Sequence, residues 1–290
     1  MLHTIQNAFL SVTVSEQGAQ LQSILGSDGT EYLWQGDPRY WADRDLTIFP
    51  YVARLTEGSY YLDGNLHHMQ IHGIAPYHNF SPEVQPQQLI FTLSSDAQTQ
   101  AVYPREFVFR VTYTLHQRML QVTYEVENRD SNIMYFGLGG HPGFQVPLVP
   151  GLQFEDYRLR FSDPAEPRRI GFTEDCFVDG TETPFPLEEQ QVLHLNHSLF
   201  DEDAIVLKDT CRQVTLESEK DPHSVTVTFP DMPYLGLWHW PKTDAPYLCI
   251  EPWSSLPAKA GEITVFEQQP DLLRLKPGDC CTYTWTVSIK

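Results

Sequence analysis

The sequence has few basic residues and no long apolar run, and both absences exclude classes of partner. Its 290 residues include 19 Lys and Arg against 38 Asp and Glu, which gives a formal net charge of −19 at pH 7. A negative field of this size repels phosphate backbones and anionic lipid headgroups, so we expect neither nucleic acid nor a membrane as partner. No segment approaches the roughly 18 apolar residues of a membrane span, and residues 1–7 lack the features of a secretion signal. We therefore expect a cytoplasmic protein.

Motifs for disulfides, metals and nucleotides are missing as well. The five cysteines form an odd number without a Cys-x-x-Cys pair, which argues against a disulfide framework and a zinc cluster. His68 and His72 are four residues apart, but the Gly and Pro that follow them exclude a helical HExxH motif, and no His-x-His pair is present. Glycine-rich nucleotide motifs and a Gly-x-Ser-x-Gly elbow are absent too. We expect no metal and no cofactor.

Apolar and polar residues alternate along several segments, which is the pattern of half-buried β-strands. The alternation is clearest in 111–115, 122–126, 225–229 and 283–287. The first two segments meet at a turn near Gln117, and Asp63-Gly64 is a dipeptide typical of a two-residue β-hairpin turn. Long amphipathic helices are not indicated, because only 37–45 and 187–195 have room for a helical turn or two. This is an all-β pattern.

No linker, charge block or internal repeat divides the chain, so we predict a single domain over residues 1–290. A compact fold of this mass keeps roughly 12,600 Å² of surface exposed, which leaves a sizeable core. The proline-containing stretches 142–150 and 164–186 are predicted to be long surface loops. The expected architecture is a large antiparallel β-sandwich with a cleft lined by loops.

Three of the eleven histidines lie in segments rich in Gly, Pro and aromatic residues. His72 precedes Gly73, His141 lies in Gly-Gly-His-Pro-Gly-Phe, and His239 lies between two Trp residues. Special backbone dihedrals at Gly and Pro orient an imidazole without a helix or a strand ladder. A pKa near 6.5 lets such a side chain give and take a proton. The alternative for His141 is a simple hydrogen bond to a turn.

Two charged residues end apolar stretches. Glu251 follows the strand-like segment 247–250, and we expect the proline after it to end the strand ladder. Partial desolvation near Trp253 favours a role for Glu251 as a base, and an ion-paired edge residue is the alternative. Arg54 has the fixed donors that suit a polyhydroxylated or anionic ligand, and an ordinary surface arginine is the alternative.

Aromatic residues make up 12% of the chain, and several lie close in sequence to these candidates. Apolar C–H faces of sugar rings stack on such side chains, so this neighbourhood suits a carbohydrate. The aromatic residues concerned are Tyr77, Phe80, Phe144, Trp238, Trp240 and Trp253. Packing in a β-core is the alternative for most of them.

The order of these segments resembles the aldose 1-epimerase (galactose mutarotase-like) family, in particular its LacX-like branch. The similarity rests on Arg54 with Gly58, His72-Gly73, Gly140-His141-Pro142 with Phe144, and Ile250-Glu251-Pro252-Trp253. It covers roughly Gly18 to the C-terminus. The resemblance implies a galactose mutarotase-like supersandwich, in which two twisted antiparallel sheets form a cleft for a monosaccharide without cofactor or metal.

The resemblance also implies interconversion of the α and β anomers of a free aldose. His141 is then the general acid that protonates the ring oxygen, and Glu251 is the base that takes the proton of the C1 hydroxyl. Each positioned proton transfer is worth about 10²–10⁴ in rate.

The same family relationship implies three sugar-binding residues. His72 and Arg54 match ligands of the ring oxygen and neighbouring hydroxyls. Asp203 matches a sugar-binding aspartate, with Asp201 as the competing position.

Two departures from the family pattern bear on the substrate. Ile74-Ala75-Pro76 follows the His-Gly motif where many relatives have Phe-Ala-Arg, so the arginine that meets a phosphate is absent and an unphosphorylated aldose is favoured. Ala53 replaces the asparagine of the galactose mutarotase branch, which leaves the sugar's identity open.

Two other functions remain open on this pattern. A non-catalytic carbohydrate-binding protein on the same fold is the first alternative. A glycoside-modifying enzyme with Glu251 and Asp203 as its carboxylate pair is the second. The sequence does not indicate an oligomeric state.

Overall fold

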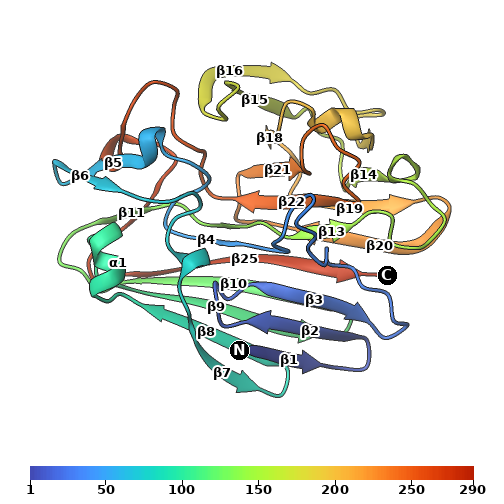
Figure 1. Cartoon of the computed structure of the whole chain (residues 1–290), viewed down its shortest axis with the longest axis horizontal. Coiled ribbons are helices and arrows are strands. Elements are labelled where there is room, and N and C mark those ends of the chain that lie inside the picture. The colour runs from blue at the N-terminus through green and yellow to red at the C-terminus, as the bar shows by residue number, and fades with distance from the viewer.

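The computed structural model describes residues 1–290 and consists mainly of β-strands (Figure 1). It contains 25 strands, one α-helix and five short 3-10 helices, so the predicted all-β class is confirmed. The accessible surface is 12,454 Å², close to the value expected from the mass.

Two large sheets dominate the fold, and within each of them every neighbouring pair of strands is antiparallel. The nine-stranded sheet has the order β17 (Val192–His194), β14 (Arg158–Phe161), β19 (Gln213–Ser218), β20 (Asp221–Thr228), β25 (Cys280–Ile289), β10 (Met119–Asn128), β9 (Phe107–His116), β8 (Gln88–Ser94) and β7 (Ser81–Gln85). The eight-stranded sheet has the order β16 (Val178–Pro184), β15 (Arg168–Phe172), β18 (Ile205–Lys208), β21 (Tyr234–Trp238), β22 (Tyr247–Trp253), β12 (Gly139–Gly140) and β4 (Thr47–Ile48), with β13 (Gly143–Gln145) also paired to β22.

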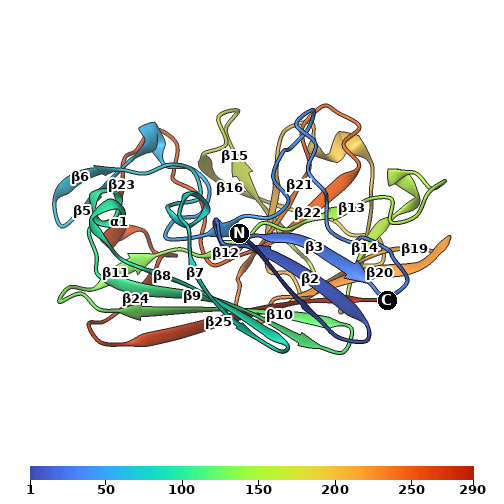
Figure 2. The same cartoon turned by 60° about the horizontal axis from the view of Figure 1, so that its bottom comes forward.

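Smaller elements complete the molecule. They are the sheet β1 (Leu2–Gln6), β2 (Leu10–Ser15) and β3 (Leu21–Gly26), the sheet β23 (Thr264–Val265), β5 (Ser59–Leu62) and β6 (Asn65–His68), the pair β11 (Met134–Phe136) and β24 (Leu273–Leu275), helix α1 (Ala97–Val102), and the 3-10 helices η1 (Thr56–Gly58), η2 (Ala75–Tyr77), η3 (Phe154–Asp156), η4 (His197–Phe200) and η5 (Phe266–Gln268). Figure 2 shows the long strands β8, β9, β10 and β25 along the bottom, with β15, β16, β21 and β22 above them. The predicted antiparallel β-sandwich is therefore confirmed.

The alternating segments of the sequence form the strands that they predict. Strands β9 and β10 pair from His116 opposite Met119, on either side of a turn at Gln117 and Arg118. Every second residue of both strands is buried, and all of these residues except Asn128 belong to a core cluster that also contains residues of β21 and β22. The Asp63-Gly64 hairpin forms as well, with φ of 51° and 75° at its two turn residues, as a type I′ turn requires.

Strand β22 departs from the prediction, because Pro252 does not end it. The strand continues to Trp253, so Glu251 lies inside a strand in which all seven residues are buried. The N–H of Ile250 donates to Pro142 O, and the nitrogen of Pro252 faces the same side of the strand. On that side β12 and β13 separate, so no ladder hydrogen bond is needed from Pro252.

Other local predictions were wrong. The stretch 164–186 contains the hairpin of β15 and β16, and 142–150 is largely buried and contains β13. No helix forms in 37–45 or 187–195. The α-helix is α1, which begins at a capping box between Asp96 and Thr99.

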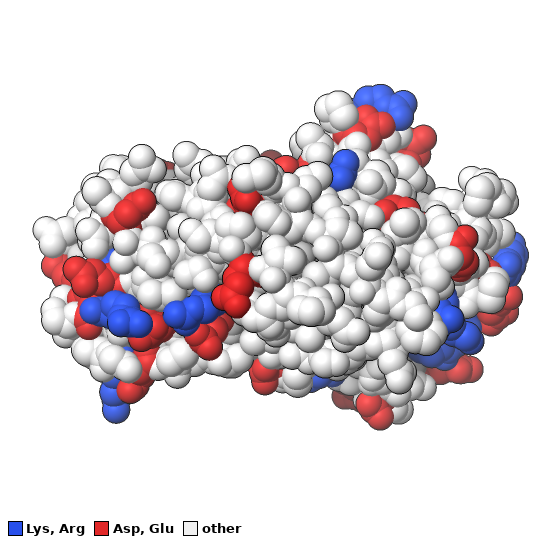
Figure 3. Space-filling view, turned by 90° about the horizontal axis from the view of Figure 1, so that it is seen from below, with Lys and Arg blue, Asp and Glu red and all other residues white.

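Charged side chains on one face of the molecule lie in mixed groups. Figure 3 shows the Lys and Arg residues of this face beside Asp and Glu residues, without a continuous basic surface. No helix in the chain has both the length and the apolar character that crossing a membrane requires.

A histidine clamp links the sheet of β1, β2 and β3 to the nine-stranded sheet, and it predicts a pH dependence of stability. His223 Nδ1 lies 2.6 Å from Asp221 Oδ1, and its Nε2 lies 3.0 Å from Asp28 Oδ2. The hydrogen bond with Asp221 raises the pKa of His223, and the bond with Asp28 adds to this effect. The stabilisation is therefore complete below the unfolded-state pKa of about 6.5 and is lost as pH rises through the higher folded-state value.

The measurement is urea unfolding of the wild type and His223→Gln at about pH 6 and about pH 8.5. We expect the unfolding free energy of the wild type to exceed that of the variant by less at the higher pH than at the lower pH. An equal difference in unfolding free energy at both pH values would contradict the clamp.

Candidate active site

A cavity of about 900 Å³ lies over the eight-stranded sheet, on the face opposite the main core. Strands β15, β18, β21 and β22 contribute to its lining, and loops around 41–46, 71–77 and 202–204 supply much of the rest. The cavity is thus the predicted loop-lined cleft. It is lined by all five site residues predicted from the sequence, namely Arg54, His72, His141, Asp203 and Glu251. Asp201, the competitor of Asp203, is not among the lining residues.

Glu251 reaches the cavity because side chains alternate along β22. Leu248 and Ile250 belong to the main core, whereas Glu251 and Trp253 line the cavity on the other face. Only 1% of Glu251 is exposed. Burial raises the pKa of its carboxyl well above the usual value, and the charges of Asp203 and Asp45 act in the same direction. The indole N–H of Trp253 opposes this shift.

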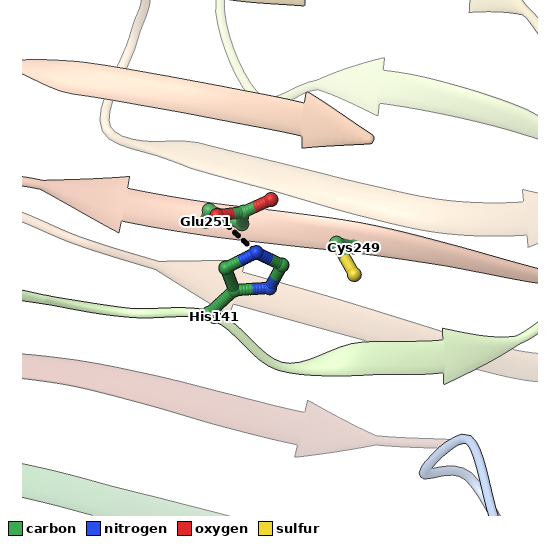
Figure 4. Close-up of side chains that lie close together, drawn as sticks. All are labelled: His141, Cys249 and Glu251. Carbon is green, nitrogen blue, oxygen red and sulfur yellow. Dashed lines mark ion pairs between the residues drawn. The ribbon is translucent and has the colours of Figure 1, made fainter. Parts of the chain in front are cut away.

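His141 lies in the short connection between β12 and β13 and faces Glu251 (Figure 4). Its Nε2 is 3.3 Å from Glu251 Oε2, and its buried Nδ1 has no hydrogen-bond partner. Burial lowers the pKa of His141 to about 4, and the charge of Asp203 partly offsets this effect. The Trp41 ring packs against the imidazole, with centroids 4.9 Å apart.

The backbone around His141 is held by packing and by a buried carboxylate. The predicted special dihedrals are not found at Gly140, whose φ is not positive. Gly140 is needed for space instead, since a Cβ there would lie 2.8 Å from Cζ2 of Trp285. The N–H of His141 donates to Asp45 Oδ1 at 3.3 Å, and the N–H of Leu21 donates to Asp45 Oδ2 at 3.2 Å.

His141 Nε2 and Glu251 Oε2 lie close enough for a proton to pass between them. Burial disfavours the imidazolium of His141 and the carboxylate of Glu251 alike, which favours a pair that holds one proton in total. That proton count is the same for neutral His with protonated Glu and for imidazolium with carboxylate. Movement of the proton from one side chain to the other interconverts these two forms without exchange of a proton with solvent.

His72 is held in one tautomer by the loop that follows β4. The N–H of Ala53 donates to His72 Nδ1 at 3.3 Å, so Nε2 carries the hydrogen and is a donor. Burial lowers the pKa of His72 well below its usual value, which keeps the ring neutral. Gly73 has φ of 86°, and a Cβ there would lie 2.2 Å from Phe49 O, so only glycine fits.

Arg54 and Asp203 contact the segment that joins β15 to β16. Arg54 Nη1 donates to Asp175 O at 3.1 Å, and the thiol of Cys176 donates to Asp203 Oδ2 at 3.1 Å. Burial raises the pKa of Cys176 to about 11, so its sulfur stays a thiol. Asp203 Oδ1 accepts the N–H of Ala204 at 2.8 Å, which orients the carboxylate.

The aromatic residues divide between the cavity and the core. Those that line the cavity are Tyr77, Trp238, Trp240 and Trp253. Phe80 and Phe144 belong to the main core, so for them the packing alternative holds. His239 does not line the cavity, because it is buried with its ring 4.4 Å from that of Phe200.

Sequence reasoning missed Trp41, Asp45 and Cys176. Trp41 lies in 37–45, where the sequence indicates only room for a helical turn or two. No local pattern indicates that Trp41 packs on His141. Asp45 has no neighbouring Gly or aromatic motif, since its partners Leu21 and His141 are distant in sequence. Cys176 has no neighbouring motif that indicates its contact with Asp203.

Cys249 completes a group of three possible metal ligands with His141 and Glu251, whose ligand atoms lie within 4.8 Å of one another. Without a metal, burial raises the pKa of Cys249 well above its usual value, so its sulfur is a neutral thiol beside the pair.

Comparison with known proteins adds to this geometry. A family model described as Aldose 1-epimerase matches residues 1–269. The chromosomal protein LacX of Lactococcus lactis subsp. lactis is 33% identical over an alignment of 299 positions, which covers 98% of each chain. The family model matches from residue 1, whereas the resemblance seen in the sequence was expected to begin at roughly Gly18.

Two solved structures have the same fold over nearly their whole length. A galactose mutarotase related enzyme from Lactobacillus acidophilus has a TM-score of 0.95 at 30% identity, covering 100% of this chain and 97% of that chain. A galactose mutarotase-like protein from Lactobacillus casei has a TM-score of 0.93 at 31% identity, covering 100% of both chains. The predicted galactose mutarotase-like supersandwich is thereby confirmed.

The role of Asp45 gives a prediction about stability. Asp45→Ala removes the acceptor of two buried N–H groups, each of which costs about 1–3 kcal/mol when left unpaired. We expect the free energy of unfolding, measured with urea, to decrease by at least the cost of one unpaired N–H group, about 1–3 kcal/mol. Asp45→Asn retains an acceptor oxygen and is expected to lose less, so equal losses in the two variants would contradict this role.

Proposed function

Because the chain belongs to the aldose 1-epimerase family, we propose that it interconverts the α and β anomers of an unphosphorylated aldose. The observation that carries this proposal is the buried pair of His141 and Glu251 on the floor of the cavity, with Nε2 and Oε2 3.3 Å apart. The ring oxygen O5 and the hydroxyl oxygen O1 of an aldose are bonded to the same carbon. A donor and an acceptor that act on both oxygens must therefore be close neighbours, as these two atoms are.

Ring opening uses the one proton that the pair holds. In the imidazolium and carboxylate form, His141 donates a proton to O5 while Glu251 accepts the proton of O1. The C1–O5 bond breaks and the C1–O1 bond becomes a carbonyl. The pair is left as neutral His141 and protonated Glu251, which is the form that burial favours.

Ring closure reverses these roles. Rotation about C1–C2 presents the other face of the carbonyl to the O5 hydroxyl. Glu251 then returns a proton to the carbonyl oxygen and His141 takes the O5 proton, which restores the starting form. No covalent intermediate and no net proton exchange are required.

The remaining predicted residues have the chemistry to hold the sugar. His72 offers a neutral Nε2–H donor, and Arg54 offers guanidinium donors that are not all used by Asp175. Asp203 is an acceptor for hydroxyl groups. We assign these three residues to substrate binding.

Removal of either member of the pair is the direct test. Glu251→Gln and His141→Ala are each expected to lower the rate of anomer interconversion at least tenfold, because a positioned proton transfer is worth about 10²–10⁴. Polarimetry or exchange NMR on a panel of aldoses measures the rate. The double variant is expected to be little worse than either single variant, because the two residues act as a unit.

The exposed pair of His194 and Glu188, with Nε2 and Oε2 2.8 Å apart, provides a matched control. His194→Ala and Glu188→Gln are expected to keep the wild-type rate. Wild-type rates in the Glu251 and His141 variants would overturn the proposed function. Sugar binding by calorimetry without faster equilibration than in buffer would favour the non-catalytic carbohydrate-binding alternative.

The pKa shifts predict a broad pH optimum. Below the lowered pKa of His141, about 4, both groups are protonated and no base remains. Above the raised pKa of Glu251, the pair loses its shared proton and no acid remains. We expect kcat/KM to be nearly flat around neutral pH when measured from about pH 4 to about pH 9 with the buffer rate subtracted. An acid limb centred on the ordinary histidine value of about 6.5 would contradict the shared-proton unit.

A further inference from the structure

The ring of His141 lacks the hydrogen bond that commonly orients an imidazole in an acid–base site. Its Nε2 faces Glu251, whereas its Nδ1 is buried and has no hydrogen-bond partner (Figure 4). In such sites the second ring nitrogen commonly bonds a carboxylate or a carbonyl, which sets the plane of the ring. Rotation about the Cβ–Cγ bond of His141 must therefore be restricted by packing.

Three aromatic rings surround this imidazole. The centroid of Trp41 lies 4.9 Å from that of His141, with 35° between the ring planes. The rings of His72 and Trp238 lie at 5.3 Å and 5.7 Å and are nearly perpendicular to the imidazole, at 84° and 82°. Rings as close and as nearly parallel as the first pair overlap by their faces, because rings side by side in one plane have more distant centroids. The indole face of Trp41 therefore covers the imidazole.

The fold holds Trp41 in this place without a ligand. Trp41 O accepts the indole N–H of Trp34 at 2.9 Å and the backbone N–H of Asp37 at 3.0 Å. Gly143, two residues after His141, leaves room for the ring, since a Cβ there would lie 3.1 Å from Trp41 Cζ3. The second glycine of the Gly-His-Pro-Gly motif thus has a role in seating the indole.

Under the proposed function, the reactive form of the pair contains an imidazolium in a dry site. The Nδ1–H of His141 then has no acceptor, and burial disfavours the charge on the ring. The negative face of an aromatic ring attracts a cation, and the attraction is larger where water is excluded. Among aromatic side chains Trp has the strongest such face, so Trp41 lowers the free energy needed to charge His141.

The ionisable side chains around the imidazole do not replace this contact. None of them forms a hydrogen bond with Nδ1. Asp45 accepts the backbone N–H of His141, and the ring of His72 and the thiol of Cys249 are neutral. The two remaining ionisable groups are Glu251, which faces Nε2, and Asp203, whose charge favours the imidazolium.

We propose that Trp41 is a positioning residue for His141, whose indole face holds the imidazole toward Glu251 and stabilises its imidazolium form. The role of that imidazolium in catalysis rests on the proposed function. Trp41 then allows a buried pair that favours its neutral form to reach its charged, reactive form.

Trp41→Leu, which keeps an apolar side chain and removes the aromatic face, is the kinetic test. We expect kcat for anomer interconversion to fall by about thirtyfold, which corresponds to about 2 kcal/mol, the value of a cation–π contact shielded from water. Trp41→Phe keeps an aromatic face and is expected to recover most of this loss. The dissociation constant of the sugar, measured by calorimetry, is expected to stay near the wild-type value in both variants. Weaker sugar binding at an unchanged kcat would overturn the inference.

A measurement without sugar tests the same contact. Between about pH 7 and about pH 5, both above the lowered pKa of His141, the Cε1–H resonance of its ring in isotope-labelled protein moves in proportion to the imidazolium fraction. His141→Gln identifies this resonance by its loss. We expect the displacement to be at least about tenfold smaller in Trp41→Leu than in the wild type, and intermediate in Trp41→Phe. An equal displacement in Trp41→Leu and the wild type would overturn the inference.

A cation over an aromatic ring outside the cavity provides a matched control. Arg118 Cζ lies 5.0 Å from the centroid of the Phe9 ring, and neither residue lines the cavity. Phe9→Leu is expected to keep the wild-type kcat and the wild-type displacement of the His141 resonance.

The outcomes separate this inference from the proposed function. Equilibration of no sugar by the wild type would overturn the proposed function, and the resonance of His141 would still decide the contact with Trp41. Equilibration by the wild type with an unchanged kcat in Trp41→Leu would overturn the inference and leave the proposed function standing.

Discussion

The acid–base chemistry of this site depends on the burial of two ionisable side chains that line the cavity. Burial disfavours a charge on either of them. His141 and Glu251 are almost fully buried, and desolvation lowers the pKa of the imidazole and raises that of the carboxyl. Both shifts favour a pair that is neutral overall and holds one proton. Under the proposed function, both forms of the pair have the same number of protons, so a proton moves across the bound hemiacetal without the cost of separating new charge in a dry site.

The surrounding fold keeps these two groups together through backbone restraints. Glu251 belongs to a strand with neighbours on both sides, so its position follows from the ladders of β21, β12 and β13. His141 belongs to the short gap between two of these neighbours and is tied to Asp45 by its own N–H. Displacement of the His141 backbone thus requires breaking a buried hydrogen bond or opening a sheet.

The family relationship and the geometry bear on different questions. Membership of the aldose 1-epimerase family accounts for the architecture of the chain. The geometry describes the cavity around the pair, with its aromatic residues and its acidic side chains. Under the proposed function, these features bear on which sugar enters.

The sequence by itself determined the fold class and the best candidates of the site. Alternation at period two predicted β9, β10, β20 and β25, because a half-buried strand needs that pattern. Motifs with Gly, Pro and aromatic residues indicated His72, His141 and Glu251, and family resemblance added roles for Arg54 and Asp203.

Tertiary structure decided everything that depends on contacts between distant segments. Glu251 and Asp45 are buried only because strands and loops far apart in sequence cover them. Neither the pKa shift of Glu251 nor the hydrogen bond from the N–H of His141 to Asp45 therefore has a local signal. Pro252 stays within its strand because β12 and β13 separate beside it. Trp41 reaches His141 across about a hundred residues of chain, and a one-dimensional pattern has no means to indicate that packing.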